Sequence, residues 1–241
     1  MAAGSGRRVV STYVLVHGGN YDSRCWRFVT PHLDGPAVLV DLPGRGRRPA
    51  PMGEVTFDDF VAAAVEDVES SNADDIVLVA HSAGGLTAAF VVNRFPERIR
   101  AVVFVSSTIP PDGGAIIDSI DPDVREAVLG GSGDGTYEID RDTLRAILCN
   151  DLDEEMTAVA LAETMPDTTA FLSAPIDLSG VKRLERAVYV RCLQDQTLPL
   201  EQQDAAIAAI GVVQVVELDA GHMCMLSRPR ELAAIIVDAG R

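Results

Sequence analysis

The chain has 241 residues, of which 47% are hydrophobic and 23% are charged. This composition supplies one sizeable core and excludes a disordered protein. The net charge of −16 repels phosphate backbones and the 5% of aromatic residues leave few rings for base stacking, so nucleic-acid binding is not expected. No apolar run reaches the roughly 18 residues of a membrane-spanning helix, so we expect no membrane association either.

Short apolar runs that predict strands alternate with segments of helical spacing. The predicted strands are Val9–Val16, Ala37–Asp41, Ile76–Ala80, Ala101–Val105, Ala187–Leu193 and Val212–Leu218. Helices are predicted over Phe57–Ser70, from the turn after His81 to about Arg94, and over Glu231–Ala239. The alternation predicts an α/β fold with a mostly parallel central sheet and helices on both faces.

Residues 112–180 break this rhythm. They contain helical stretches at Val124–Leu129, Thr143–Leu152 and Glu154–Thr164 but no convincing strand. We therefore expect one core, formed by residues 1–111 and 181–241, with residues 112–180 inserted as a helical cap. This inserted segment holds 16 acidic residues and three arginines, so it carries −13 of the total charge. Its acidity is either a solvated face or a field that disfavours anionic partners at the entrance of a site.

The four cysteines, Cys25, Cys149, Cys192 and Cys224, form no C-x-x-C pair. In a chain of this length they are expected to be free thiols in a reducing compartment. The basic pair near the N-terminus is not followed by the apolar region of a signal peptide. A cytoplasmic protein is therefore expected.

The segment Val79-Ala80-His81-Ser82-Ala83-Gly84-Gly85 lies between a predicted strand and a predicted helix. A serine at such a turn has strained backbone geometry and exposes its hydroxyl above the sheet. The pattern resembles G-x-S-x-G, with Ala80 at the first glycine position. Ser82 is therefore the candidate nucleophile.

A serine hydroxyl needs a base and a group that orients the base. His222 follows the last predicted strand, and Asp195 follows the strand before it, so the chain order is serine, aspartate, histidine. Asp112 and Asp219 are alternative acids. An oxyanion hole needs two fixed donors, for which we expect the backbone N–H groups of Ala83 and Gly19.

Taken together, these residues resemble the α/β-hydrolase superfamily. Four segments narrow the resemblance to the methylesterase and hydroxynitrile lyase branch: Leu15–Gly19 with Cys25-Trp26, Val79–Gly85, Asp195–Pro199 and His222–Pro229. In that branch the lyases carry Thr after the first-loop histidine and Lys after the catalytic histidine. This chain has Gly18 and Met223 at those positions, which favours an esterase.

Weaker expectations concern the pocket and the nearby surface. Gly18, Trp26 and Met223 are candidate pocket residues, although Trp26 is as readily explained by core packing. Arg45, Arg47 and Arg48 form a short basic turn that we expect to be solvated.

The sequence thus predicts a serine hydrolase that cleaves a carboxylic ester of a small, fairly apolar molecule through an acyl-enzyme. No His, Cys and Asp cluster has metal-ligand spacing, so neither a metal nor a cofactor is expected. The alternatives are a thioesterase for carrier-bound or coenzyme A acyl groups, a lyase or cofactor-independent oxygenase on the same scaffold, and a ligand-binding receptor that retains the triad.

Overall fold

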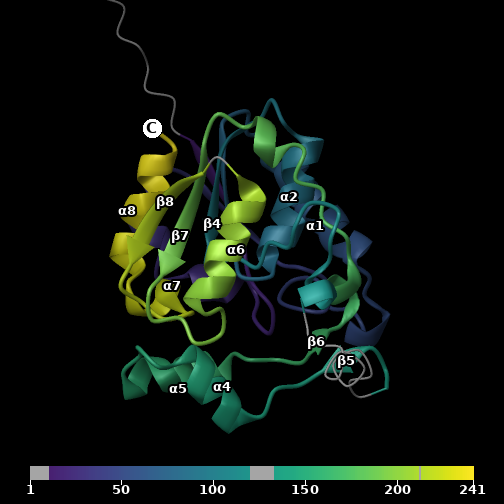
Figure 1. The fold of residues 1–241 in the computed structure, drawn as a ribbon, viewed down its shortest axis with the longest axis vertical. Coiled ribbons are helices and arrows are strands. Elements are labelled where there is room, and N and C mark those ends of the chain that lie inside the picture. The colour runs from purple at the N-terminus through teal and green to yellow at the C-terminus, as the bar shows by residue number, and fades with distance from the viewer. Residues whose placement is uncertain (1–10, 120–132, 212) are drawn as a thin grey trace, which may run out of the picture.

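The computed structural model describes residues 11–119, 133–211 and 213–241. Six strands form one sheet in the order β2-β1-β3-β4-β7-β8, and every neighbouring pair is parallel (Figure 1). Their bounds are β1 (Thr12–Val16), β2 (Ala37–Val40), β3 (Ile76–His81), β4 (Ile99–Val105), β7 (Ala187–Cys192) and β8 (Gln214–Leu218). The predicted fold class is confirmed.

Both faces of the sheet are covered by helices. On one face lie α1 (Phe57–Ser71), α2 (Gly84–Arg94) and α6 (Leu200–Ile210); on the other lies α8 (Pro229–Ala239), with the short α7 (Cys224–Ser227) beside it. Alternate residues of each strand enter the two apolar layers, and all six residues of β3 are buried. A buried parallel sheet directs the carboxyl ends of all its strands to one edge, where the loops that follow them meet.

Helix α6 was not among the predicted elements. Its sequence, LEQQDAAIAAI, is rich in alanine and polar residues, and Gln203 is buried within it. The Gln203 side chain accepts from the Cys192 N–H at 2.9 Å and donates to the Cys192 carbonyl at 2.9 Å. A polar residue therefore faces the core at a position where the hydrophobic pattern would require an apolar one.

The described residues 133–168 of the inserted segment lie beyond the carboxyl ends of the strands (Figure 1). Helices α4 (Arg141–Leu148) and α5 (Glu154–Ala162) overlap two of the predicted helical stretches, while Val124–Leu129 lies outside the described residues. The expectation of no strand here is wrong, because β5 (Thr136–Tyr137) and β6 (Asp167–Thr168) form an antiparallel ribbon. Two-residue strands have no periodicity to detect, and these two are about 30 residues apart in sequence.

The turn from β3 into α2 lies directly against the chain that follows β1. A Cβ atom on Gly84 would lie 2.4 Å from the His17 carbonyl oxygen, which is backbone and cannot move aside alone. A Cβ atom on the next residue, Gly85, would instead meet side-chain atoms, Ile109 Cδ1 at 2.7 Å and Ser107 Cβ at 2.9 Å. The first position therefore requires glycine more strictly than the second.

We predict that Gly84→Ala destabilises the protein by about 1–3 kcal/mol, the usual cost of overpacking, which lowers the Tm by several degrees. Gly85→Ala is the matched control, because both changes replace glycine by alanine in the same helix and so gain the same helix propensity, about 1 kcal/mol. It should remain within about 1 kcal/mol of the wild type. Thermal unfolding measures both, and equal losses in the two variants would contradict the backbone contact as the cause.

Candidate active site

Ser82 lies at the turn between β3 and α2. Its φ of 50° is in the left-handed region, which is uncommon for a residue with a side chain and costs about 1–3 kcal/mol. Backbone hydrogen bonds hold this conformation: Ser82 N–H donates to the Val105 carbonyl at 3.1 Å, and the Ser82 carbonyl accepts from Thr108 N–H at 3.2 Å. The strain places the hydroxyl at the carboxyl edge of the sheet.

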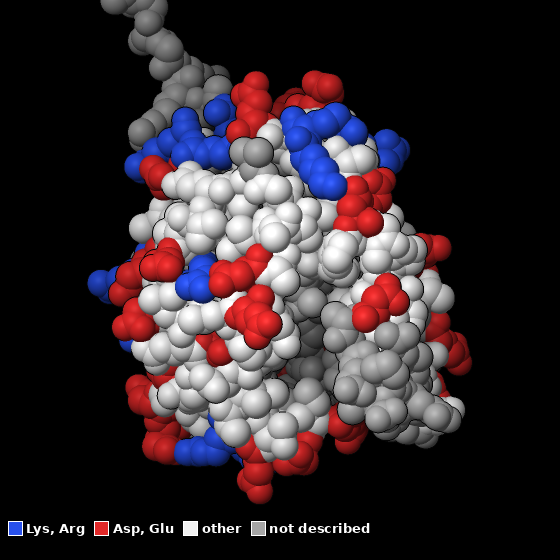
Figure 2. Space-filling view, viewed as in Figure 1, with Lys and Arg blue, Asp and Glu red and all other residues white. Residues whose placement is uncertain are grey.

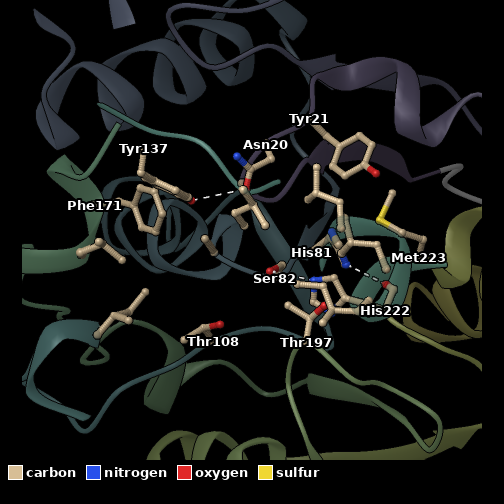
Figure 3. A pocket seen from close by; sticks show the side chains of 18 residues that line it. Asn20, Tyr21, His81, Ser82, Thr108, Tyr137, Phe171, Thr197, His222 and Met223 are labelled. Atoms are coloured by element: carbon tan, nitrogen blue, oxygen red, sulfur yellow. Dashed lines mark hydrogen bonds between the residues drawn. The ribbon is translucent and has the colours of Figure 1, made fainter. Parts of the chain in front are cut away.

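The structure brings Ser82, His222 and Asp195 into one hydrogen-bonded chain. The His222 Nε2 atom lies 3.1 Å from Ser82 Oγ, and its Nδ1 atom lies 2.6 Å from Asp195 Oδ2 (Figure 3 shows the serine and histidine). The histidine and aspartate side chains are buried. With a neutral imidazole, Nδ1–H donates to the carboxylate and the serine O–H donates to Nε2.

Asp195 is fixed on both oxygens. Its Oδ1 accepts from the backbone N–H groups of Thr197 at 2.7 Å and Leu198 at 2.8 Å, and its Oδ2 accepts from the Ser106 hydroxyl. Burial alone would raise the pKa of Asp195, but the charge of His222 and these hydrogen bonds lower it below its usual value. The carboxylate therefore stays ionised against the imidazole.

The two alternative acids lie elsewhere. Asp112 is exposed and pairs with Lys182 at 2.8 Å. Asp219 is also exposed and accepts from Gln194 Nε2 at 2.6 Å. Of the three candidates, Asp195 is the one that contacts His222.

The loop after β1, residues 17–20 (the β1 loop), lies over the serine. A Cβ atom on Gly18 would be 2.8 Å from Ser82 Cβ, so only a glycine allows this approach. Gly19 and Ala83, the predicted oxyanion donors, line the same cavity as Ser82 and His222.

This cavity has a volume of about 740 Å³ counted to its open mouth. Among the described residues that line it there is no Asp, Glu, Lys or Arg. Its apolar wall comes largely from the inserted segment and its polar groups lie at separate points (Figure 3). The apolar side chains include Ile116, Ile139, Leu144, Leu148, Phe171, Leu172 and Met223, and the polar ones include Asn20, Tyr137, Thr108 and Thr197.

Of the predicted pocket residues, Met223 lines the cavity, whereas Trp26 and Gly18 are not among its lining residues. Trp26 is fully buried and packs edge-on against His81, with ring centroids 6.4 Å apart. Gly18 lines a separate small cavity behind the β1 loop. The core-packing explanation of Trp26 therefore fits the structure, and the pocket role does not.

The predicted solvation of the basic turn is wrong for Arg45. Its side chain is 1% exposed and forms an ion pair with Asp167, whose side chain is fully buried. Its guanidinium also lies over the Phe60 ring, 5.1 Å from the centroid. Arg47 is 66% exposed, as expected, and pairs with Asp41 at 2.9 Å. The sequence held no signal for the buried pair, because its members are 122 residues apart.

His17 is buried in the β1 loop. Leu42 N–H donates to its Nε2 at 3.2 Å, so Nδ1 carries the proton and donates to the Gly18 carbonyl at 2.7 Å. Burial, and then the positive charge of Arg45, lowers the pKa of His17 to about 3. The imidazole is therefore neutral in the folded protein, and its two hydrogen bonds hold the β1 loop against the chain at Leu42.

This pKa predicts an acid-labile fold. The unfolded chain binds a proton at His17 below about pH 6.5 and the folded protein does not, so the free energy of unfolding falls as the pH drops from about 6.5 towards 3. Each pH unit removes up to about 1.4 kcal/mol through this group. We predict that the free energy of unfolding, measured in urea between pH 4.5 and 7.5, falls less steeply with decreasing pH in His17→Gln than in the wild type. The exposed His32, changed to Gln, should keep the wild-type slope, and a wild-type slope in His17→Gln would contradict the assignment.

Within the described part of the chain, no helix is long and apolar enough to cross a membrane. The described residues also contain no group of three or more His, Cys, Asp and Glu side chains placed to hold a metal ion.

Comparisons with known proteins agree with this architecture. The model of the alpha/beta hydrolase family matches residues 13–235. Methylesterase 9 of Arabidopsis thaliana is 32% identical over 249 residues, covering 91% of this chain and 94% of the relative. Polyneuridine aldehyde esterase of Rauvolfia serpentina is 26% identical over 255 residues, covering 94% of each.

A solved structure has the same fold. An extracellular alpha/beta-hydrolase from a Paenibacillus species superposes with a TM-score of 0.86 at 21% identity, covering 96% of this chain and 99% of that one. The resemblance noted from the motifs is thereby confirmed, and the chain belongs to the α/β hydrolase family, with plant methylesterases among its relatives.

Proposed function

We propose that the protein hydrolyses carboxylic esters of small, uncharged molecules, with Ser82 as the nucleophile. The observation that carries the proposal is the hydrogen-bonded chain from Ser82 through His222 to Asp195, which opens into a cavity without charged side chains. The methylesterase relatives support an ester as the substrate.

The proposed reaction follows from this geometry. Ser82 Oγ attacks the ester carbonyl while its proton passes to His222 Nε2, and Asp195 stabilises the imidazolium. The N–H groups of Gly19 and Ala83 bind the negative oxygen of the tetrahedral intermediate. His222 returns the proton to the departing alcohol, which leaves an acyl-enzyme. His222 then takes a proton from water, whose oxygen attacks the acyl carbon and releases the acid and Ser82.

The inserted segment would act as a cap that shapes the substrate site, because Tyr137, Leu144 and Phe171 come from it. Gly18 and Met223 stand where the lyases of the branch carry Thr and Lys, which supports hydrolysis over cyanohydrin cleavage. The four cysteines are buried free thiols, which fits the predicted cytoplasmic location.

We predict that Ser82→Ala lowers ester turnover by about 10⁶-fold without unfolding the protein. The change removes the nucleophile and leaves the buried His222–Asp195 pair in place. A fluorophosphonate probe followed by peptide mass spectrometry should label Ser82 in the wild type. Labelling at another residue, or near-normal turnover of p-nitrophenyl acetate by the variant, would contradict the assignment of Ser82 as the nucleophile. Wild-type protein that does not react with the probe at all would favour the ligand-binding receptor.

A second prediction concerns charge. A methyl ester of a neutral aromatic acid should have a kcat/KM at least about 100-fold above that of the same ester carrying a ring carboxylate, because the cavity offers that carboxylate no partner. Raising the salt concentration should increase the kcat/KM of the charged ester by at most about tenfold. Salt screens the repulsion between this ester and the acidic surface, but it does not lower the cost of desolvating the carboxylate. Equal rates for the two esters would contradict the uncharged substrate class, and faster cleavage of an acyl-coenzyme A would favour the thioesterase alternative.

A further inference from the structure

The β5–β6 ribbon of the inserted segment is attached to the β1 loop. Asn20 N–H donates to Asp167 Oδ2 at 2.7 Å, Asn20 Nδ2–H donates to the Met165 carbonyl at 3.0 Å, and Met165 N–H donates to the Asn20 carbonyl at 3.0 Å. Asn20 has a φ of 60°, in the left-handed region. These three hydrogen bonds, with a fourth from the Tyr137 hydroxyl to Asn20 Oδ1 at 3.4 Å, stabilise an uncommon backbone conformation next to Gly19.

Asp167 is the centre of this attachment. Its Oδ2 also lies 3.0 Å from where a Gly19 Cβ atom would be, so the carboxylate packs directly on the proposed oxyanion donor. Its Oδ1 accepts from Thr168 N–H at 2.8 Å and pairs with Arg45. Asp167 and Arg45 line the small cavity behind the β1 loop together with Gly19 and Ala83. Gly19 and Ala83 also line the cavity that contains Ser82, whereas Asp167 and Arg45 do not.

Arg45 explains how a carboxylate can be used in this position. Burying a carboxylate is costly unless it is paired, and the buried guanidinium of Arg45 supplies the partner of Asp167, so that its hydrogen bonds are charge-assisted. The bond to Asn20 N–H is therefore strong and directional. The Gly18–Gly19 pair that precedes it has the most freedom of any dipeptide, so it depends on such an anchor to hold one conformation.

We propose that Asp167 is a positioning residue, by which the inserted segment holds the Gly19 N–H in the orientation that binds the oxyanion. The inference rests on the proposed esterase function. The catalytic cavity has no charged side chain among its described lining residues, so the negative oxygen depends on backbone N–H groups whose placement is set beforehand. Asp167 does not touch the substrate; it acts through Asn20 and Gly19.

The variant Asp167→Asn isolates this bond. The amide is nearly isosteric, and its oxygen is drawn to the two donors on the Oδ1 side, Arg45 and Thr168 N–H. Its NH2 group then faces Asn20 N–H, a donor against a donor, and the anchor of the β1 loop is lost. Arg45→Lys is the matched variant on the same ion pair, because it weakens the pair and the packing on Phe60 but leaves the carboxylate bound to Asn20 N–H. Asp112→Asn, on the exposed pair with Lys182, is the control outside the site.

The experiment measures kcat and KM for p-nitrophenyl acetate. The number of reactive sites is counted by fluorophosphonate titration and kcat is expressed per site, so that unfolded protein does not lower the measured kcat. Removing one oxyanion donor costs about 10²–10³ in kcat, so misplacing one through Asp167→Asn should cost about 10–100-fold, with KM within about threefold. The inhibition constant of a trifluoromethyl ketone, which forms a tetrahedral oxyanion on the serine, should rise by the same factor as kcat/KM falls. Arg45→Lys should lower the Tm but keep kcat per site within about threefold, and Asp112→Asn should match the wild type.

The inference is overturned if Asp167→Asn keeps a wild-type kcat per titrated site, since the pair would then serve stability alone. It is also overturned if Arg45→Lys loses as much kcat per site as Asp167→Asn, since the loss would then follow from disturbing the buried ion pair and not from losing the bond between Asp167 and Asn20 N–H. Wild-type protein that neither reacts with the probe nor hydrolyses the ester would overturn the proposed function and this inference with it. Wild-type activity with an unchanged Asp167→Asn would overturn only the inference.

Discussion

The close approach of two loops at the carboxyl edge of the sheet is the constraint on which the site depends. The loop after β1 crosses the turn after β3 so tightly that Gly18 nearly touches Ser82 and Gly84 nearly touches the His17 carbonyl. The two loops meet because β1 and β3 are parallel neighbours, so that their carboxyl ends lie side by side at the same edge. The same crossing buries His17, keeps it neutral, and brings the proposed oxyanion donors beside the serine hydroxyl.

The part of this arrangement that follows from strand order could be predicted from the sequence. Ser82, Asp195 and His222 each follow a strand that the apolar runs revealed, so their meeting at one edge follows from a parallel sheet. The chain order favoured Asp195 over Asp112 and Asp219. Its contact with His222 needed the structure, because the direction of a loop side chain has no sequence pattern.

What could not be predicted depends on contacts between distant segments. Arg45 was expected in solvent with its two basic neighbours, since a cluster of arginines on a turn is normally exposed. Its partner Asp167 lies on a two-residue strand in an acidic segment, where one carboxylate among many gives no reason to expect burial. Helix α6 was missed because its buried face includes Gln203, which replaces apolar packing with hydrogen bonds to Cys192.

The distribution of charge fits the neutral substrate that we propose. Acidic side chains are spread over the face in Figure 2, while most of its lysines and arginines gather at the end opposite α4 and α5. The cavity itself contributes no charged side chain among the residues described. Hydrolysis would turn a neutral ester into a carboxylate within this uncharged cavity, beneath an acidic segment, and both features favour its release.

The most direct test of the account is a crystal structure of the enzyme after reaction with a small fluorophosphonate, whose phosphoryl oxygen stands in for the oxyanion. We predict a covalent bond to Ser82 Oγ, with the phosphoryl oxygen within about 3.1 Å of the N–H groups of both Gly19 and Ala83. Asn20 should still be bound to Asp167. An adduct on another residue, or a phosphoryl oxygen that points away from these two N–H groups, would contradict the central claim that the two crossing loops form one catalytic site.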